Sequence, residues 1–97
     1  MPGGTLDISV AAQRIRKAAY ASKQAGDVEQ EVTAVARDWL TAADGREGPP
    51  QVKEAVGELA RKLSLMAADA LEDNEPRHAE ILERASDQAQ AEARRIN

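Results

Sequence analysis

The stretch Asp44–Pro50, which reads DGREGPP, divides the chain into two arms. Two glycines and two prolines so close together cannot continue a helix. Pro50 suits the first turn of a following helix, where its missing N–H costs nothing. We therefore expect a central turn over residues 44–50, with a helical arm on each side of it.

The arm before this turn has the apolar spacing of a helix. Its small and apolar residues recur at intervals of three and four, and not at the interval of two that a strand shows. A first stripe comprises Ile8, Ala11, Ile15, Ala18, Ser22 and Ala25, and a second comprises Val28, Val32, Val35, Trp39 and Ala42. At 100° per residue the second stripe is rotated by roughly 110° from the first. This offset predicts a kink or break near residues 26–27, where Gly26 suits the end of one helix and Asp27 the N-cap of the next.

The arm after the turn has a third stripe and a second weak point. The stripe comprises Val52, Val56, Leu59, Leu63, Met66 and Ala70. A second break is expected near residues 73–76, where Asn74 can cap a helix and Pro76 can occupy its first turn. Only Ile81, Leu82 and Ile96 are large and apolar beyond this break, so the sequence predicts that the last helix is the most loosely held.

Composition favours one small helical domain with a thin core. The 97 residues form a single domain by length, 1–97, with a flexible N-terminus over residues 1–5. Alanine occurs 20 times, whereas leucine, isoleucine and valine together occur 17 times. Alanine favours helices but offers little side chain to bury. The predicted fold class is all-α, either an antiparallel helical hairpin with kinked arms or a compact four-helix bundle, completed by oligomerisation.

The residue types present argue against a classical enzyme. Cysteine is absent and His78 is the only histidine, so one chain cannot supply a Ser/His/Asp triad or a zinc site with several histidines. We expect no catalytic residues, no cofactor and no bound metal. The net charge is −4, so the chain lacks the basic balance typical of nucleic-acid binding. No signal peptide or membrane span is visible, which predicts a cytoplasmic protein or one exported without a cleavable signal peptide.

The remaining expectation is a protein–protein interaction module that forms a homodimer, or a heterodimer with another helical protein. Leu65 and Leu71 lie off the third stripe, on another face of the second arm. One seam between the two arms cannot cover both of these faces. The predicted interaction residues are Trp39, Val52, Val56, Leu59, Leu63 and Met66. Trp39 continues the second stripe, so its ring should face the opposing helix, with the indole N–H bonded near the helix end or the 44–48 loop.

Two other functions fit parts of the sequence. A small DNA-associated regulator, such as an antitoxin or a phage-type accessory protein, would need two basic clusters to meet at the open end of a hairpin. These clusters are Arg14, Arg16 and Lys17, and Arg94 with Arg95. A dimeric di-iron protein that resembles the encapsulated ferritins would use the Glu75-x-x-His78 spacing, with Glu29 or Glu31 as bridging carboxylates.

The layout of the whole chain resembles the Trp-Xaa-Gly helical-hairpin proteins of type VII secretion systems. The shared features are about a hundred residues, two alanine-rich arms, and a tryptophan just before a central turn. Trp39-Leu40-Thr41 stands where the family has Trp-Xaa-Gly, and Tyr20 is the only tyrosine, so the family's C-terminal Tyr-xxx-Asp/Glu export signal has no counterpart. The resemblance implies a helical hairpin, with Trp39 at the position of the turn tryptophan.

Overall fold

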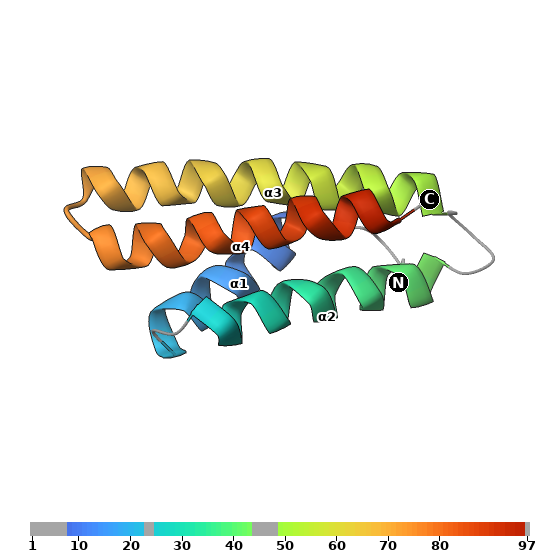
Figure 1. Cartoon of the computed structure of the whole chain (residues 1–97), viewed down its shortest axis with the longest axis horizontal. Helices are drawn as coiled ribbons and strands as arrows, with labels where there is room; N and C mark the ends of the chain where they lie inside the picture. The colour runs from blue at the N-terminus through green and yellow to red at the C-terminus, as the bar shows by residue number, and fades with distance from the viewer. Residues whose placement is uncertain (1–7, 23–24, 44–48, 97) are drawn as a thin grey trace.

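The computed structural model describes residues 8–22, 25–43 and 49–96, which form four α-helices and no strand. The helices are α1 (Ile8–Ser22), α2 (Ala25–Ala43), α3 (Pro49–Glu72) and α4 (Pro76–Arg95) (Figure 1). The all-α prediction is therefore confirmed. The predicted flexible segment 1–5 and residues 44–48 of the predicted central turn lie outside the described residues.

The helices lie side by side around one interior. α3 and α4 run antiparallel along the long axis, α2 lies beside α4, and the shorter α1 contacts both α2 and α3 (Figure 1). The molecule measures 43 × 28 × 20 Å, with a radius of gyration of 13.0 Å. This radius is close to the ~13 Å expected for a compact chain of about 100 residues.

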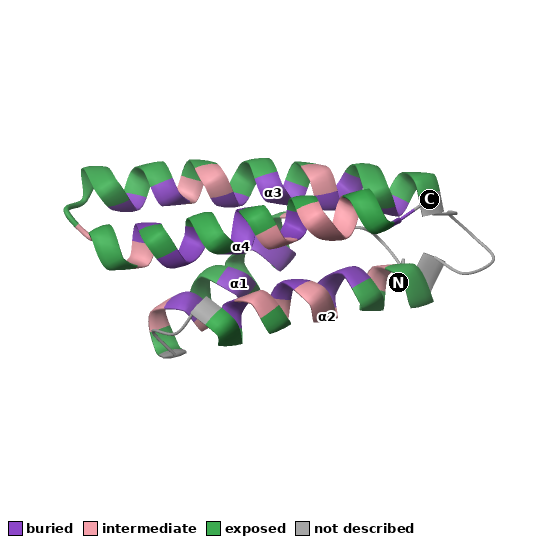
Figure 2. Ribbon diagram, in the orientation of Figure 1, coloured by how far each residue is buried: buried purple, intermediate pink, exposed green. Residues whose placement is uncertain are grey.

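The core combines a few large aliphatic side chains with many alanines. Figure 2 shows that each helix turns one buried stripe inward. The largest fully buried aliphatic side chains are Ile15, Val28, Val32, Val52, Val56, Leu59, Leu63 and Leu82. The three stripes predicted from the sequence supply most of these residues, because apolar side chains at helical spacing must leave water on one face. Alanines fill the positions between them.

The first break lies slightly before its predicted position. α1 ends at Ser22 and α2 begins at Ala25, so Gly26 and Asp27 lie inside the first turn of α2. The prediction of a break at residues 26–27 was therefore a few residues late. Glycine and aspartate are both tolerated in a first turn, where backbone N–H groups lack helical partners. The negative charge of Asp27 also interacts favourably with the positive end of the helix dipole.

The second break is a tight turn that Asn74 makes possible. Asn74 has φ 64°, in the left-handed region that asparagine tolerates. Its N–H donates to Leu71 O at 3.0 Å, and Glu75 N–H donates to Ala70 O at 2.8 Å. This pair of bonds is a Schellman motif, which closes α3. Pro76 occupies the first turn of α4, as predicted, but the N-cap is Glu75 and not Asn74.

The last helix is well packed, which corrects the prediction that it is the loosest. α3 and α4 share the most extensive contact of any helix pair. The buried residues of α4 are Ala79, Ile81, Leu82, Ala85, Ser86 and Ala89. The buried Ser86 hydroxyl donates to Ala60 O of α3 at 2.7 Å. Small side chains let two helix backbones approach closely, so that many atoms of the two helices come into van der Waals contact. The alanines from which a loosely held helix was predicted therefore contribute to close packing.

Candidate interaction surfaces

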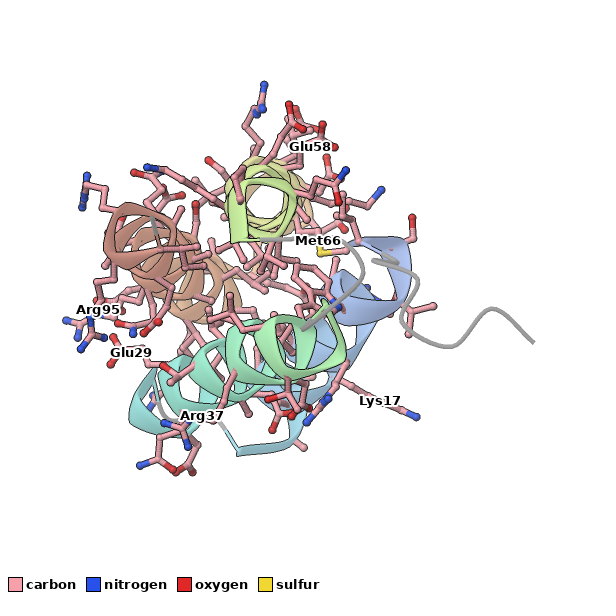
Figure 3. All side chains as sticks on the ribbon, turned by 90° about the vertical axis from the view of Figure 1, so that its right-hand side faces the viewer. Lys17, Glu29, Arg37, Glu58, Met66 and Arg95 are labelled. Carbon is pink, nitrogen blue, oxygen red and sulfur yellow. The ribbon has the colours of Figure 1, made fainter. Side chains whose placement is uncertain are left out.

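The residues predicted to form an interaction surface lie mostly inside the chain's own core. Val52, Val56, Leu59 and Leu63 are all buried against the other helices. Met66 is partly buried, on the side of α3 that faces α1 in Figure 3. These side chains stabilise the single chain, so they do not supply the exposed apolar surface from which self-association was predicted.

Trp39 occupies a border position. It is partly buried and packs against the core from the last turns of α2. The ring therefore faces the other helices, as the stripe predicted, while part of it stays in contact with water. The loop proposed to accept its indole N–H, residues 44–48, lies outside the described residues.

The large aliphatic side chains that the fold leaves exposed belong to other positions. Val10 is 62% exposed, Leu40 37%, Leu65 68% and Leu71 60%. Leu65 and Leu71 are the two residues that the sequence placed off the third stripe. Val10 and Leu40 could have been found by the same criterion, since each departs from the stripe of its own helix.

A shallow groove of about 420 Å³ lies between α3 and α4, at the end where their turn closes. We call it the α3/α4 groove. It is lined by Ser64, Ala67, Ala68, Leu71, Pro76, Ala79, Glu80 and Glu83. Serine and alanine form half of the lining, Leu71 is its largest apolar side chain, and both charged residues are acidic. A cation beside an aliphatic group is the chemistry that such a surface recognises.

The outer side of α1 has the opposite charge, and we call it the α1 face. Its residues are Val10, Gln13, Arg14, Arg16, Lys17 and Tyr20, which surround another surface hollow. Arg14 forms ion pairs with Glu31, and with Asp38 at 3.8 Å, both on α2. The Arg16 guanidinium lies 5.0 Å from the centre of the Tyr20 ring. Lys17 forms no ion pair with any described residue, and Figure 3 shows its side chain extending away from the helices.

The single tyrosine and the single histidine meet where α1 approaches the turn between α3 and α4. The rings of Tyr20 and His78 stack with centroids 3.9 Å apart and planes at 6°. The Tyr20 hydroxyl donates to Glu75 Oε1 at 2.9 Å, and His78 Nδ1 lies 3.8 Å from Glu75 Oε2. The hydrogen bond to the Glu75 carboxylate, together with burial, raises the pKa of Tyr20 above its ordinary value of 10.0. This cluster fixes α1 to the turn.

α2 is fixed to α4 by a polar seam. Gln88 Nε2 donates to Thr33 Oγ1 at 3.1 Å and to Glu92 Oε2 at 3.0 Å. Arg95 Nη1 donates to the same Glu92 oxygen at 3.1 Å. Because these polar groups already bond to one another within the chain, they offer a partner fewer hydrogen-bonding groups than an unpaired surface would. The α3/α4 groove is therefore the better candidate for binding.

The two basic clusters do not meet as the DNA-binding alternative requires. Lys17 and Arg95, one from each cluster, lie on opposite sides of the molecule in Figure 3. The Glu75-x-x-His78 pair does come together, as its spacing predicts, but the third group beside it is Tyr20. Among the described residues, no three His, Cys, Asp or Glu side chains gather in a way that could hold a metal ion.

Comparisons with known proteins add no relatives. No family model, no curated protein and no solved structure matches this chain. Within the described helices, none combines the length and apolar character that crossing a bilayer requires. Any functional conclusion therefore depends on the surfaces themselves.

Proposed function

We propose that this chain is a non-enzymatic protein–protein interaction module that associates with further copies of itself. One observation carries the proposal. Leu65 and Leu71 expose most of their side chains on α3, although the core of the single chain is already filled without them. Burying an exposed leucine stabilises an association by up to about 1.5–3 kcal/mol.

The size of the chain supports the same proposal. A chain of this length buries a smaller fraction of its surface than a larger domain does, and its stability is correspondingly small. Association adds apolar burial without lengthening the chain. A hairpin and a bundle, the two arrangements expected from the sequence, would both gain stability from oligomerisation, because it buries apolar surface that a single chain leaves exposed. The narrower assignment to type VII secretion stays a prediction.

The test is the mass of the protein in solution. Sedimentation equilibrium from low micromolar to near-millimolar concentration should show a weight-average mass that rises above 10.4 kDa. The double variant Leu65→Ser/Leu71→Ser should stay monomeric with unchanged helicity, since neither side chain belongs to the core. Leu40→Ser, at the less exposed leucine of α2, is the matched control and should associate like the wild type. A wild-type chain that stays monomeric throughout would contradict the proposal.

A further inference from the structure

We propose that the copies associate head to tail, with the α1 face of one chain seated in the α3/α4 groove of the next. This inference rests on the proposed function, because it specifies how a self-associating chain would bind itself. The occupant of the groove is thus a second copy, and the contact joins two different surfaces.

Charge complementarity is the first argument. The charged residues that line the groove are Glu80 and Glu83, whereas those of the α1 face are Arg14, Arg16 and Lys17. Complementary potentials orient two proteins as they meet and disfavour other orientations. Arg14 and Arg16 are already engaged within the chain, so Lys17 is the cation that the groove would attract.

The spacing of apolar and charged groups is the second argument. On α1, Val10 and Lys17 are seven residues apart, which places them about 10 Å apart along one side of the helix. On α4, Pro76 and Glu83 are also seven residues apart, and Pro76 shares the end of the groove with Leu71. When α1 lies along α4, Val10 therefore reaches the Leu71 end while Lys17 reaches Glu83.

The positions of the two surfaces in the fold give the third argument. Viewed along the long axis, α3 and α4 occupy the top and the left of Figure 3, whereas α1 lies on the right with Lys17 pointing outward. A chain cannot seat its own α1 face in its own groove, and both surfaces can be occupied at once. A contact between different surfaces forms a ring if its rotation closes and an open chain if it does not.

The two kinds of contact contribute differently. The aliphatic contact between Val10 and Leu71 supplies most of the affinity, because apolar area leaves water. Exposed ion pairs add little affinity and are screened by salt. The charges therefore select the register, and raising the ionic strength should weaken the association without abolishing it.

The experiment uses two variants that each disable one surface. Lys17→Glu places a negative charge opposite Glu80 and Glu83. Like charges brought together oppose association far more than one exposed ion pair favours it, so this variant disables the α1 face. Leu71→Asn removes the apolar side chain of the groove without adding charge. Each variant alone should bind itself at least about tenfold more weakly than the wild type does, which corresponds to a loss of about 1.4 kcal/mol. Lys62→Glu and Leu40→Asn are the matched controls, because both positions are exposed and lie outside the two surfaces.

Mixing the two variants decides the geometry. The Leu71→Asn chain keeps its α1 face and the Lys17→Glu chain keeps its groove, so an equimolar mixture should form a 1:1 heterodimer with wild-type affinity and grow no further. The wild type should grow beyond a dimer as its concentration rises. A wild type that stops at a dimer, with a mixture that stays monomeric, would mean a symmetric contact and would overturn this inference while the proposed function stands. A monomeric wild type would overturn both, and circular dichroism of each variant excludes loss of folding as the cause.

Discussion

The α3–α4 pair and the α1–α2 pair are joined by different chemistry. α3 and α4 are 24 and 20 residues long, each buries several alanines, and the Ser86–Ala60 hydrogen bond joins them. α1 and α2 are 15 and 19 residues long and add an exposed ion pair between Arg14 and Glu31 to their valine and isoleucine contacts. The pair with more extensive contact contains the helix with fewer large apolar residues. The number of large side chains therefore does not account for the extent of contact, to which helix length and small buried residues both contribute.

The largest expected effect comes from deleting residues 86–97. The sequence alone predicted that the last helix is the most loosely held, but this segment contributes Ser86, Ala89 and Ile96 to the buried interior. Its removal exposes the facing side of α3 along several turns, so we expect loss of the cooperative thermal transition. Circular dichroism melting of the shortened chain measures this. A cooperative transition close to that of the full chain would show that α4 is held only near its beginning.

A matched pair of cavity-forming substitutions compares the two helix pairs directly. Leu82 of α4 and Ile15 of α1 are both fully buried. Replacement of either by alanine should cost about 2–5 kcal/mol of unfolding free energy, and the cost is larger where neighbours cannot move into the cavity. We expect Leu82→Ala to cost more, because the closely packed α3–α4 pair has less freedom to collapse. Urea unfolding of both variants gives the two values, and equal or reversed costs would contradict the comparison.

A smaller effect is expected from the hydrogen bond that joins the closely packed helices. Ser86→Ala removes the donor to Ala60 O, and the carbonyl left behind already accepts a bond within its helix. The unfolding free energy should fall by about 1 kcal/mol. Ser64→Ala, at a partly exposed serine of α3, is the control and should change it by less than ~0.5 kcal/mol. Equal effects at the two positions would show that the buried bond adds nothing specific.

Much of the fold could be predicted from the sequence, because local chemistry decides it. Helical spacing identified the buried stripes, and Pro76 marked the start of α4. The division between α1 and α2 was harder, since Gly26 is the conspicuous residue nearby and yet lies within α2. The tight contact of α4 could not be predicted from its few large residues, because close approach depends on which alanines face one another across two helices.

The candidate surfaces were less predictable than the fold. Leu71 could be found as an apolar residue off its stripe, but its acidic surroundings come from Glu80 and Glu83 on a different helix. The Tyr20–Glu75 hydrogen bond joins residues 55 positions apart, and no spacing rule connects them. Periodicity assigns a residue to the inside or the outside of a helix. It does not say which outside residues of two helices come together.

The smallest expected effect concerns the Tyr20–Glu75 hydrogen bond that fixes α1 to the other helix pair. Because the carboxylate of Glu75 raises the pKa of Tyr20 in the folded chain, folding favours the neutral phenol. The resulting stabilisation is fully present below the unfolded pKa of about 10 and is lost as pH rises through the higher pKa of the folded chain. The chain has one tyrosine, so its ultraviolet absorbance reports this ionisation directly. Glu75→Gln should lower the pKa of Tyr20 towards its ordinary value and reduce the alkaline loss of stability, while burial still raises that pKa. Glu72→Gln removes a nearby carboxylate that makes no hydrogen bond to Tyr20 and should change neither the pKa nor the alkaline loss. If Tyr20 of the wild type ionises at its ordinary value, the bond to Glu75 does not persist in solution, and α1 is fixed to the turn by the ring stack with His78 alone.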